Sequence, residues 1–116
     1  MLDINDFKLI NDTYGHAEGD RALILVSNAL KEVVRNHSIP MFLARYGGDE
    51  FILVAHPTSE SEIDAIICEI RERIEARCRM EGTPYTISIG AGYDKLAGET
   101  DTFQKCMQRA DEKLYE

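Results

Sequence analysis

The sequence contains little that would carry it into a membrane or out of the cell. No stretch of its 116 residues approaches the ~20 consecutive apolar residues of a membrane-spanning helix, and its start lacks the basic and then apolar order of a signal peptide. Its three cysteines, Cys68, Cys78 and Cys106, form no C-x-x-C pair and fall in amphipathic patterns where a small apolar residue would also fit. We therefore expect reduced thiols, no membrane contact by this segment, and a cytoplasmic location, either alone or as the cytoplasmic part of a larger protein.

Positive charge is also in short supply. Thirteen lysines and arginines stand against twenty-one aspartates and glutamates, for a net charge of −8. This charge repels a polyanionic duplex, so we expect no nucleic-acid partner. It does not exclude a small phosphate ligand, because a divalent cation held by carboxylates reverses the local field.

The length and composition predict one folded domain over residues 1–116, with 44% hydrophobic and 29% charged residues. Apolar residues that recur every three or four positions predict helices, and short apolar runs beside glycines predict strands. The predicted helices cover residues 20–36, 59–79 and 101–115, and the predicted strands cover residues 41–45, 51–55 and 83–93. This order predicts an α/β (α+β) fold with a central, mostly antiparallel sheet and one layer of packed helices.

The first residues resemble the end of a strand. Met1 and Leu2 precede Asp3 directly, whereas a typical strand has ~5 residues. We therefore expect the first strand to be largely missing and the domain to be partial. Asp3 would then lie at the carboxyl end of a strand, where ligands commonly bind in such sheets. The alternative is that Asp3 caps a short helical segment over residues 6–12.

A predicted hairpin carries two adjacent carboxylates at its tip. Gly47 and Gly48 suit a turn, but a turn has no use for both Asp49 and Glu50. A buried apolar run follows at once, so the Glu50 carboxylate lies close to the apolar layer and needs a partner, of which a cation is the simplest. Together with Asp3, these side chains supply the two or three oxygen ligands that Mg²⁺ takes beside substrate phosphates. A solvated turn is the alternative.

Polar groups that suit a purine base are dense between residues 7 and 20. Asn11 offers an amide donor and acceptor, and Asp20 can accept two N–H bonds, which matches the donor edge of guanine. Lys8 can place a positive charge on a phosphate. The alternatives are structural: Asp20 as a helix N-cap, Gly15 as the left-handed end of a short helix, Lys8 as solvated surface and His16 as a loop residue.

These motifs together resemble the GGDEF domain of diguanylate cyclases, which has a nucleotidyl-cyclase-like fold. The resemblance covers nearly the whole chain, in the order and at the spacings of the family. It rests on Asp3 to Lys8, Asn11-Asp12, Gly15-His16, Gly19-Asp20, Arg45 to Phe51, Ser88-Ile89-Gly90, Ala110-Asp111 and Leu114-Tyr115.

The resemblance implies a signalling enzyme, a nucleotidyltransferase that condenses two GTP molecules into the bacterial second messenger cyclic di-GMP and works as a homodimer. It implies Mg²⁺, or Mn²⁺, held by Asp3, the backbone carbonyl of Ile4, Asp49 and Glu50. It implies GTP bound by Phe7, Lys8, Asn11, His16, Asp20, Gly47 and Gly48. The residues it makes catalytic are Asp49, Glu50 and Lys8, with Asp49 as the candidate proton acceptor.

The sequence departs from the family pattern in places. The Arg-x-x-Asp of the family's product-inhibition site is replaced by the segment from Ser38 to Met41, so we expect that site to be absent. The basic residues that follow Leu-Tyr in the family are not in this chain, and we expect the 116-residue piece to be weakly active or inactive. An attached sensory domain is expected in the parent protein. The competing hypothesis is a catalytically inactive GGDEF-like module that binds GTP and regulates a neighbour.

Overall fold

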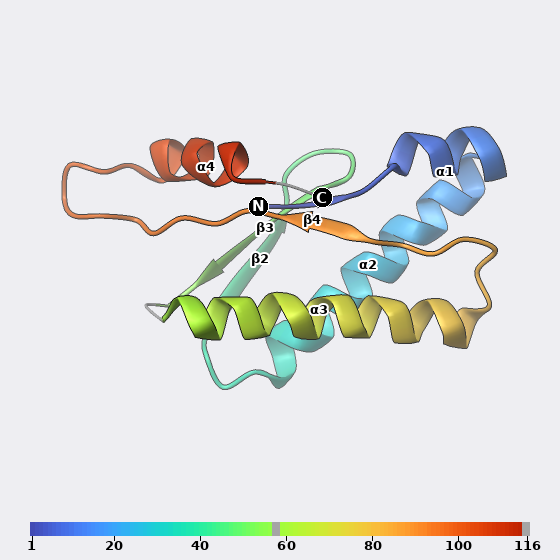
Figure 1. Ribbon diagram of the computed structural model, residues 1–116, viewed down its shortest axis with the longest axis horizontal. Coiled ribbons are helices and arrows are strands. Elements are labelled where there is room, and N and C mark those ends of the chain that lie inside the picture. Colours follow the sequence, from blue (N-terminus) through green and yellow to red (C-terminus); the bar gives the residue numbers. More distant parts are fainter. Residues whose placement is uncertain (57–58, 115–116) are drawn as a thin grey trace.

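The computed structural model describes residues 1–56 and 59–114, which form an antiparallel sheet with helices on both faces (Figure 1). The strand order is β2-β3-β1-β4, and all three pairings are antiparallel. Along the chain the elements are β1 (Leu2–Ile4), α1 (Phe7–Tyr14), α2 (His16–Asn36), β2 (Met41–Arg45), β3 (Glu50–Ala55), α3 (Glu60–Glu81), β4 (Ile89–Ala91) and α4 (Phe103–Glu112). The predicted fold class is confirmed.

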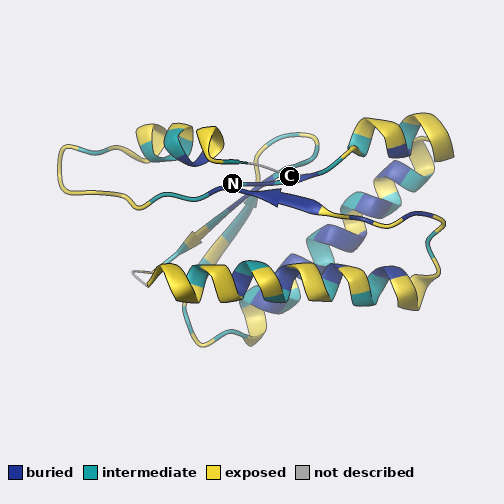
Figure 2. Cartoon of the chain, viewed as in Figure 1, coloured by how far each residue is buried: buried dark blue, intermediate teal, exposed yellow. Residues whose placement is uncertain are grey.

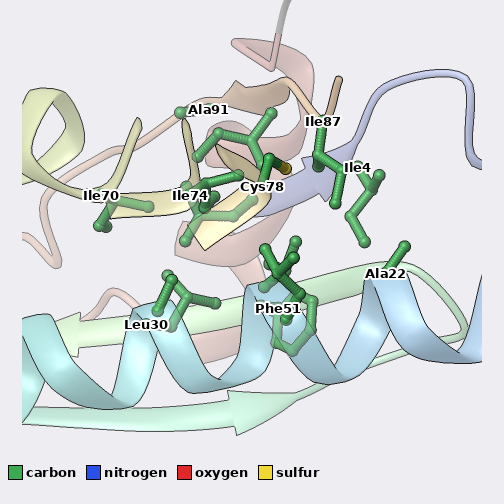
Figure 3. Close-up of a cluster of buried hydrophobic side chains, with 14 of the residues drawn as sticks. Ile4, Ala22, Leu30, Phe51, Ile70, Ile74, Cys78, Ile87 and Ala91 are labelled. Carbon is green, nitrogen blue, oxygen red and sulfur yellow. The ribbon is translucent and has the colours of Figure 1, made fainter. Parts of the chain in front are cut away.

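One face of the sheet packs against α2 and α3 and forms the core. Leu2 lies opposite Phe51 on one side and opposite Ala91 on the other, so these three side chains share a face. They are buried together with Ile70 and Ile74 of α3 (Figure 3). The buried residues of α2 and α3 face this layer, while their outer surfaces are exposed (Figure 2). Burying a side chain of this size contributes about 1.5–3 kcal/mol, so the core fixes the strand register.

The helix ends differ from the prediction mainly at α2. This helix begins at His16, directly after Gly15, whose positive φ of 94° ends α1. Asp20 is therefore inside the helix and is not its N-cap, contrary to one of the structural alternatives. The start of α3 agrees with the sequence, because the Ser59 side chain accepts a hydrogen bond from the Glu62 backbone N–H. Its end at Gly82, with φ 61°, lies a little beyond the predicted end.

Three further predictions needed correction. Only Ile89–Ala91 of the predicted strand 83–93 is a strand; the residues before it are held by α2, where the Tyr85 hydroxyl donates to the Glu18 carboxylate at 2.9 Å. Burial and this bond raise the pKa of Tyr85 to about 12. Helix α4 runs from Phe103 to Glu112, and residue 115 lies outside the described ranges. Cys68 is exposed rather than apolar-packed, although the Cys78 thiol is buried.

The helices form two layers rather than the single predicted layer. Gly92 follows β4 and faces away from the core, toward the end of α4. A Cβ atom at Gly92 would overlap the carbonyl oxygen of Ala110 and would lie 2.5 Å from the Leu114 backbone nitrogen. The absence of a side chain at Gly92 therefore lets α4 approach the sheet. None of the helices within the described ranges combines the length and apolar character of a membrane-spanning segment.

Replacing Gly92 should loosen the contact between α4 and the sheet. We expect Gly92→Ala to lower the free energy of unfolding by about 1–3 kcal/mol, because the atoms in the way belong to backbone and cannot rotate aside. Urea denaturation measures the change. Gly48→Ala is the control, since a Cβ atom there meets nothing within 4 Å. Equal midpoints for the two variants would contradict this account of Gly92.

Candidate functional site

The end of β1 and the start of β3 bring two carboxylates side by side. Asp3 lies directly opposite Glu50 in the antiparallel register, on the sheet face turned away from the α2 and α3 core. Directly opposite residues in such a pair have Cβ atoms about 4.5–5.5 Å apart. The Ile4 backbone N–H also donates to the Asp49 carbonyl oxygen at 3.1 Å, which ties the end of β1 to the hairpin tip. The backbones of Asp3, Ile4, Asp49 and Glu50 are therefore adjacent, with the Asp3 and Glu50 side chains on the same face of the sheet.

The loop that carries the carboxylates is held by its own backbone and by one side chain. The Tyr46 and Gly47 N–H groups donate to the Glu50 carbonyl oxygen at 2.9 and 3.4 Å. The Arg45 guanidinium donates from Nε to the Gly47 carbonyl at 3.1 Å and from Nη2 to the Gly48 carbonyl at 2.7 Å. The sequence reasoning missed this role of Arg45. The available signal was an arginine at a strand end, directly before a loop rich in glycine carbonyls.

The two glycines of the loop are not needed for its backbone conformation. Neither Gly47 nor Gly48 has a positive φ, so the turn does not require glycine in the way that the sequence suggested. A Cβ atom at Gly47 would make ordinary contact with Glu50, 3.8 Å from its Cδ, and one at Gly48 would meet nothing. The Glu50 carboxylate therefore lies against Gly47, and the missing side chains leave open space beside it.

The donor set fits magnesium that is shared with a substrate. Within residues 1–56 and 59–114, no group of three or more His, Cys, Asp or Glu side chains gathers around a common point. Mg²⁺ is usually held by one or two carboxylates together with waters and substrate phosphates, rather than by a closed protein cage. The paired Asp3 and Glu50, both half-buried, match this smaller requirement.

Helix α1 follows β1 after two intervening residues, and no side chain makes a capping hydrogen bond at its N-terminal end. Asp6 is the N-cap in a left-handed conformation, with φ 55°, but its side chain makes no capping hydrogen bond, and the first turn has no acidic residue. Phe7 packs against the core, and Lys8 is exposed. The free N–H groups and the helix dipole therefore favour an anion at this end. The N-cap is Asp6, so the alternative capping role for Asp3 is not observed.

Asn11, one of the two candidate base-binding residues, contacts α2 one residue before the other, Asp20. A Cβ atom at Gly19 would overlap Oδ1 of Asn11 and would lie 2.8 Å from its Cγ, so the Asn11 carboxamide rests directly on Gly19. Asp20 is the next residue and is exposed, as is His16 at the start of α2. Gly19 is buried. Its contact with Asn11 explains why a glycine stands inside this helix, which the sequence alone did not reveal.

An open antiparallel sheet carries a carboxylate pair close in sequence to a helix N-terminus, and such groups can hold a divalent cation and a phosphate. Comparison with known proteins gives the family. Residues 1–116 match the family model described as diguanylate cyclase, GGDEF domain. The chain belongs to the GGDEF domain family. It is 38% identical to diguanylate cyclase A of Treponema denticola, covering all of this chain and 31% of that protein. It is 37% identical to diguanylate cyclase DosC of Escherichia coli K12, covering 99% of this chain and 25% of that protein.

Solved structures agree with this assignment. Diguanylate cyclase SiaD of Pseudomonas aeruginosa, solved with its activator SiaC, superposes with a TM-score of 0.81 at 28% identity, over 97% of this chain and 42% of that one. The GGDEF domain of DgcB from Caulobacter crescentus, in complex with c-di-GMP, superposes with a TM-score of 0.77 at 32% identity, over 96% of this chain and 65% of that one. The chain spans about a third or less of the length of the two curated relatives.

Loss of the Arg45 contacts should free the loop without unfolding the domain. We expect Arg45→Met to lower the free energy of unfolding by no more than about 1 kcal/mol, because these bonds are exposed to water. Backbone order parameters of residues 46–49 should fall from about 0.85 to below about 0.6 in NMR relaxation. Arg79→Met removes an exposed ion pair with Glu75 and is the control. Unchanged order parameters in the first variant would show that Arg45 does not hold the loop.

Proposed function

We propose that this domain condenses two GTP molecules into cyclic di-GMP and two pyrophosphates, with Mg²⁺ or Mn²⁺, as a homodimer in which each domain holds one GTP. The cross-strand pairing of Asp3 and Glu50 beside the Asp49 backbone carries the proposal. The names of the relatives support it, as does the c-di-GMP bound to the similar DgcB domain. In the parent protein, an attached regulatory domain would control the reaction.

The metal ligands in this proposal are Asp3, Asp49, Glu50 and the carbonyl oxygen of Ile4. A divalent ion bound there would neutralise phosphate charge and favour loss of pyrophosphate. Contacts with β1 fix the positions of the hairpin residues. The strand register holds Glu50 opposite Asp3, and the hydrogen bond from the Ile4 N–H to the Asp49 carbonyl holds the hairpin tip. Gly47 and Gly48 leave room for the nucleotide to approach the backbone.

The nucleotide would lie along α1, with its phosphates at the start of the helix. The uncapped N–H groups after Asp6 attract phosphate oxygens, and Lys8 adds a positive charge from the first turn. Further along, the Asn11 carboxamide and the Asp20 carboxylate would bind the guanine edge, with Asp20 accepting from two N–H groups. His16 lies at the start of α2, close in sequence to both.

In the chemical step, the 3′-hydroxyl of one GTP attacks the α-phosphorus of the other. A new P–O bond forms, the bond to the β-phosphate oxygen breaks, and pyrophosphate leaves; the reciprocal step closes the ring. Asp49 accepts the hydroxyl proton in our proposal. Such reactions depend mainly on positioning and charge neutralisation, and the facing of two identical sites supplies the positioning.

Feedback by product at the Ser38 to Met41 segment is not part of the proposal. Ser38 is exposed, and Met41 packs against the core as the first residue of β2. Neither side chain offers the charged, bidentate contacts that arginine and aspartate make with guanine and phosphate.

Activity and its dependence on one carboxylate test the proposed reaction. We expect the full-length parent protein, incubated with GTP and Mg²⁺, to form cyclic dinucleotide that chromatography separates from GTP, and its Glu50→Gln variant to form none. Glu72→Gln removes an exposed carboxylate on α3 and should leave the rate unchanged. Comparable rates in Glu50→Gln and the unmodified domain would refute the role of Glu50. Binding of GTP with Mg²⁺ but no product in any sample would favour the regulatory module.

Gly19→Ala tests guanine recognition without removing any polar group. The added methyl displaces the Asn11 carboxamide, so we expect GTP affinity to fall about three- to tenfold, as for one lost hydrogen bond. The helix itself should become no less stable, because alanine favours helix over glycine. In an Asn11→Ala background the same change should cost nothing further, which a double-mutant cycle of GTP affinities measures. Additive losses would show that Gly19 acts by another route.

A further inference from the structure

The two residues between β1 and α1 have features that are unfavourable on their own. Asp6 has a positive φ of 55° and is the one residue other than glycine with such a φ within residues 1–56 and 59–114. The Asn5 Oδ1 atom is buried, and it has no hydrogen-bond partner in the described part of the chain. Left-handed backbone and unpaired buried acceptors persist only where neighbouring contacts hold them, and they concentrate at functional sites. Asn5 and Asp6, which we call the junction, must therefore be held by their neighbours.

Ser88 holds the junction through two hydrogen bonds. The Asn5 backbone N–H donates to the Ser88 carbonyl at 3.0 Å, and the Asn5 side-chain Nδ2 donates to the Ser88 Oγ at 3.1 Å. The first bond extends the ladder between β1 and β4 by one residue, because Ile4 is already paired with Ile89. The second bond adds a side-chain link at the last rung of this ladder, before the chain turns into α1.

Ser88 is itself fixed by the core. Ile87 and Ile89, on either side of it, are 8% and 3% exposed, whereas Ser88 is exposed. This alternation places the Ser88 side chain on the sheet face turned away from α2 and α3, the face that also carries Asp3. Ile87 belongs to the same buried cluster as Ile4 (Figure 3). Ser88 is therefore a rigid partner for the junction, and it lies on the face of the candidate site.

The backbone bond of the junction sets the direction of the Ile4 carbonyl. In a trans peptide group the C=O and the N–H point in opposite directions. The peptide group between Ile4 and Asn5 directs its N–H toward β4, so its carbonyl points the other way, toward the hairpin tip next to β3. The Ile4 N–H donates to the Asp49 carbonyl on that side, but within the described ranges the Asp49 N–H makes no backbone bond in return. The Ile4 carbonyl is thus turned toward Asp49 and Glu50 and is free of that ladder bond.

We propose that Asn5 and Ser88 are positioning residues, and that their side-chain hydrogen bond keeps the Ile4 carbonyl directed at the divalent cation. The inference rests on the proposed function, because it takes the Ile4 carbonyl to be one of the ligands of that cation. Without this bond the Asn5 side chain no longer restrains the junction, and Asp6 can leave its left-handed conformation, which turns the adjoining peptide groups. Cation affinity then falls, because Mg²⁺ demands near-ideal octahedral geometry. Both residues act through the peptide group between Ile4 and Asn5.

Removal of the Ser88 hydroxyl tests the proposal in the full-length parent protein. The probe is Mn²⁺ with a GTP analogue whose α- and β-phosphorus atoms are joined by a methylene group, which prevents turnover, and electron paramagnetic resonance measures the free Mn²⁺. We expect Ser88→Ala to raise the Kd for Mn²⁺ about three- to tenfold, as for one lost hydrogen bond. Ser88→Thr keeps the hydroxyl and should bind Mn²⁺ as the unmodified protein does. Ser61→Ala is the matched control, because it removes an exposed hydroxyl that is hydrogen-bonded to the Ser59 hydroxyl at the start of α3.

A double-mutant cycle and the unfolding temperature separate positioning from a general loss of structure. Asn5→Ala, alone or combined with Ser88→Ala, should weaken Mn²⁺ binding as much as Ser88→Ala does, because all three proteins lack the same bond. The Tm of Ser88→Ala without metal should stay within about 2 °C of the unmodified value, since the lost bond is exposed to water.

Three results would overturn the proposal. The first is an unchanged Kd for Mn²⁺ in Ser88→Ala, whether or not its Tm falls. The second is an equal loss of affinity in Ser88→Thr and Ser88→Ala, and the third is additive losses in the double variant. An unmodified protein that binds no Mn²⁺ with the analogue would refute the proposed cation site, and this inference with it. Binding of Mn²⁺ by the unmodified protein and by Ser88→Ala with equal affinity would refute the inference alone.

Discussion

The antiparallel register between β1 and β3 is the constraint on which the candidate site depends. Leu2 and Phe51 are buried opposite each other, and this places Asp3 opposite Glu50 on the other face. A shift of one residue would turn the apolar pair toward solvent and the carboxylates into the core, and the cost of that exchange is the reason the register is unique. The core therefore positions the carboxylates without touching them.

Around that pair the site is built mostly from backbone. The hairpin tip is closed by main-chain hydrogen bonds and by the Arg45 guanidinium, and α1 presents an uncapped N-terminus two residues after β1 ends. A chain with a net charge of −8 can attract a triphosphate only through such local features, because fixed dipoles and a bound cation act at short range while the overall charge is screened.

The core and the candidate site meet in β1. This strand has three residues, and it carries Asp3 between the core contacts of Leu2 and Ile4. The packing of Leu2 and Ile4 therefore sets the position of the Asp3 carboxylate. Stability of the sheet centre and placement of this candidate ligand are coupled through one short element.

Much of the architecture is predictable from local pattern. The apolar periodicity of α3, its Ser59 cap and the paired apolar runs of the hairpin indicated their elements with nearly correct ends, because these signals act within a few residues. The motifs also identified the family. The start of α2 was predicted too late, because Gly19 counts against a helix until its contact with Asn11 is known. The strand predicted over residues 83–93 was too long, because Tyr85 is held by α2.

The sequence alone thus determined which elements form and which polar groups the chain carries. Only the tertiary structure decided that Asp3 meets Glu50, that Gly92 admits α4 and that Arg45 closes the loop over the glycine carbonyls. The physical reason is the sequence distance over which the interactions act. Helix and strand patterns reflect neighbours a few residues apart, whereas the pairing of residues 3 and 50 depends on how the whole core packs.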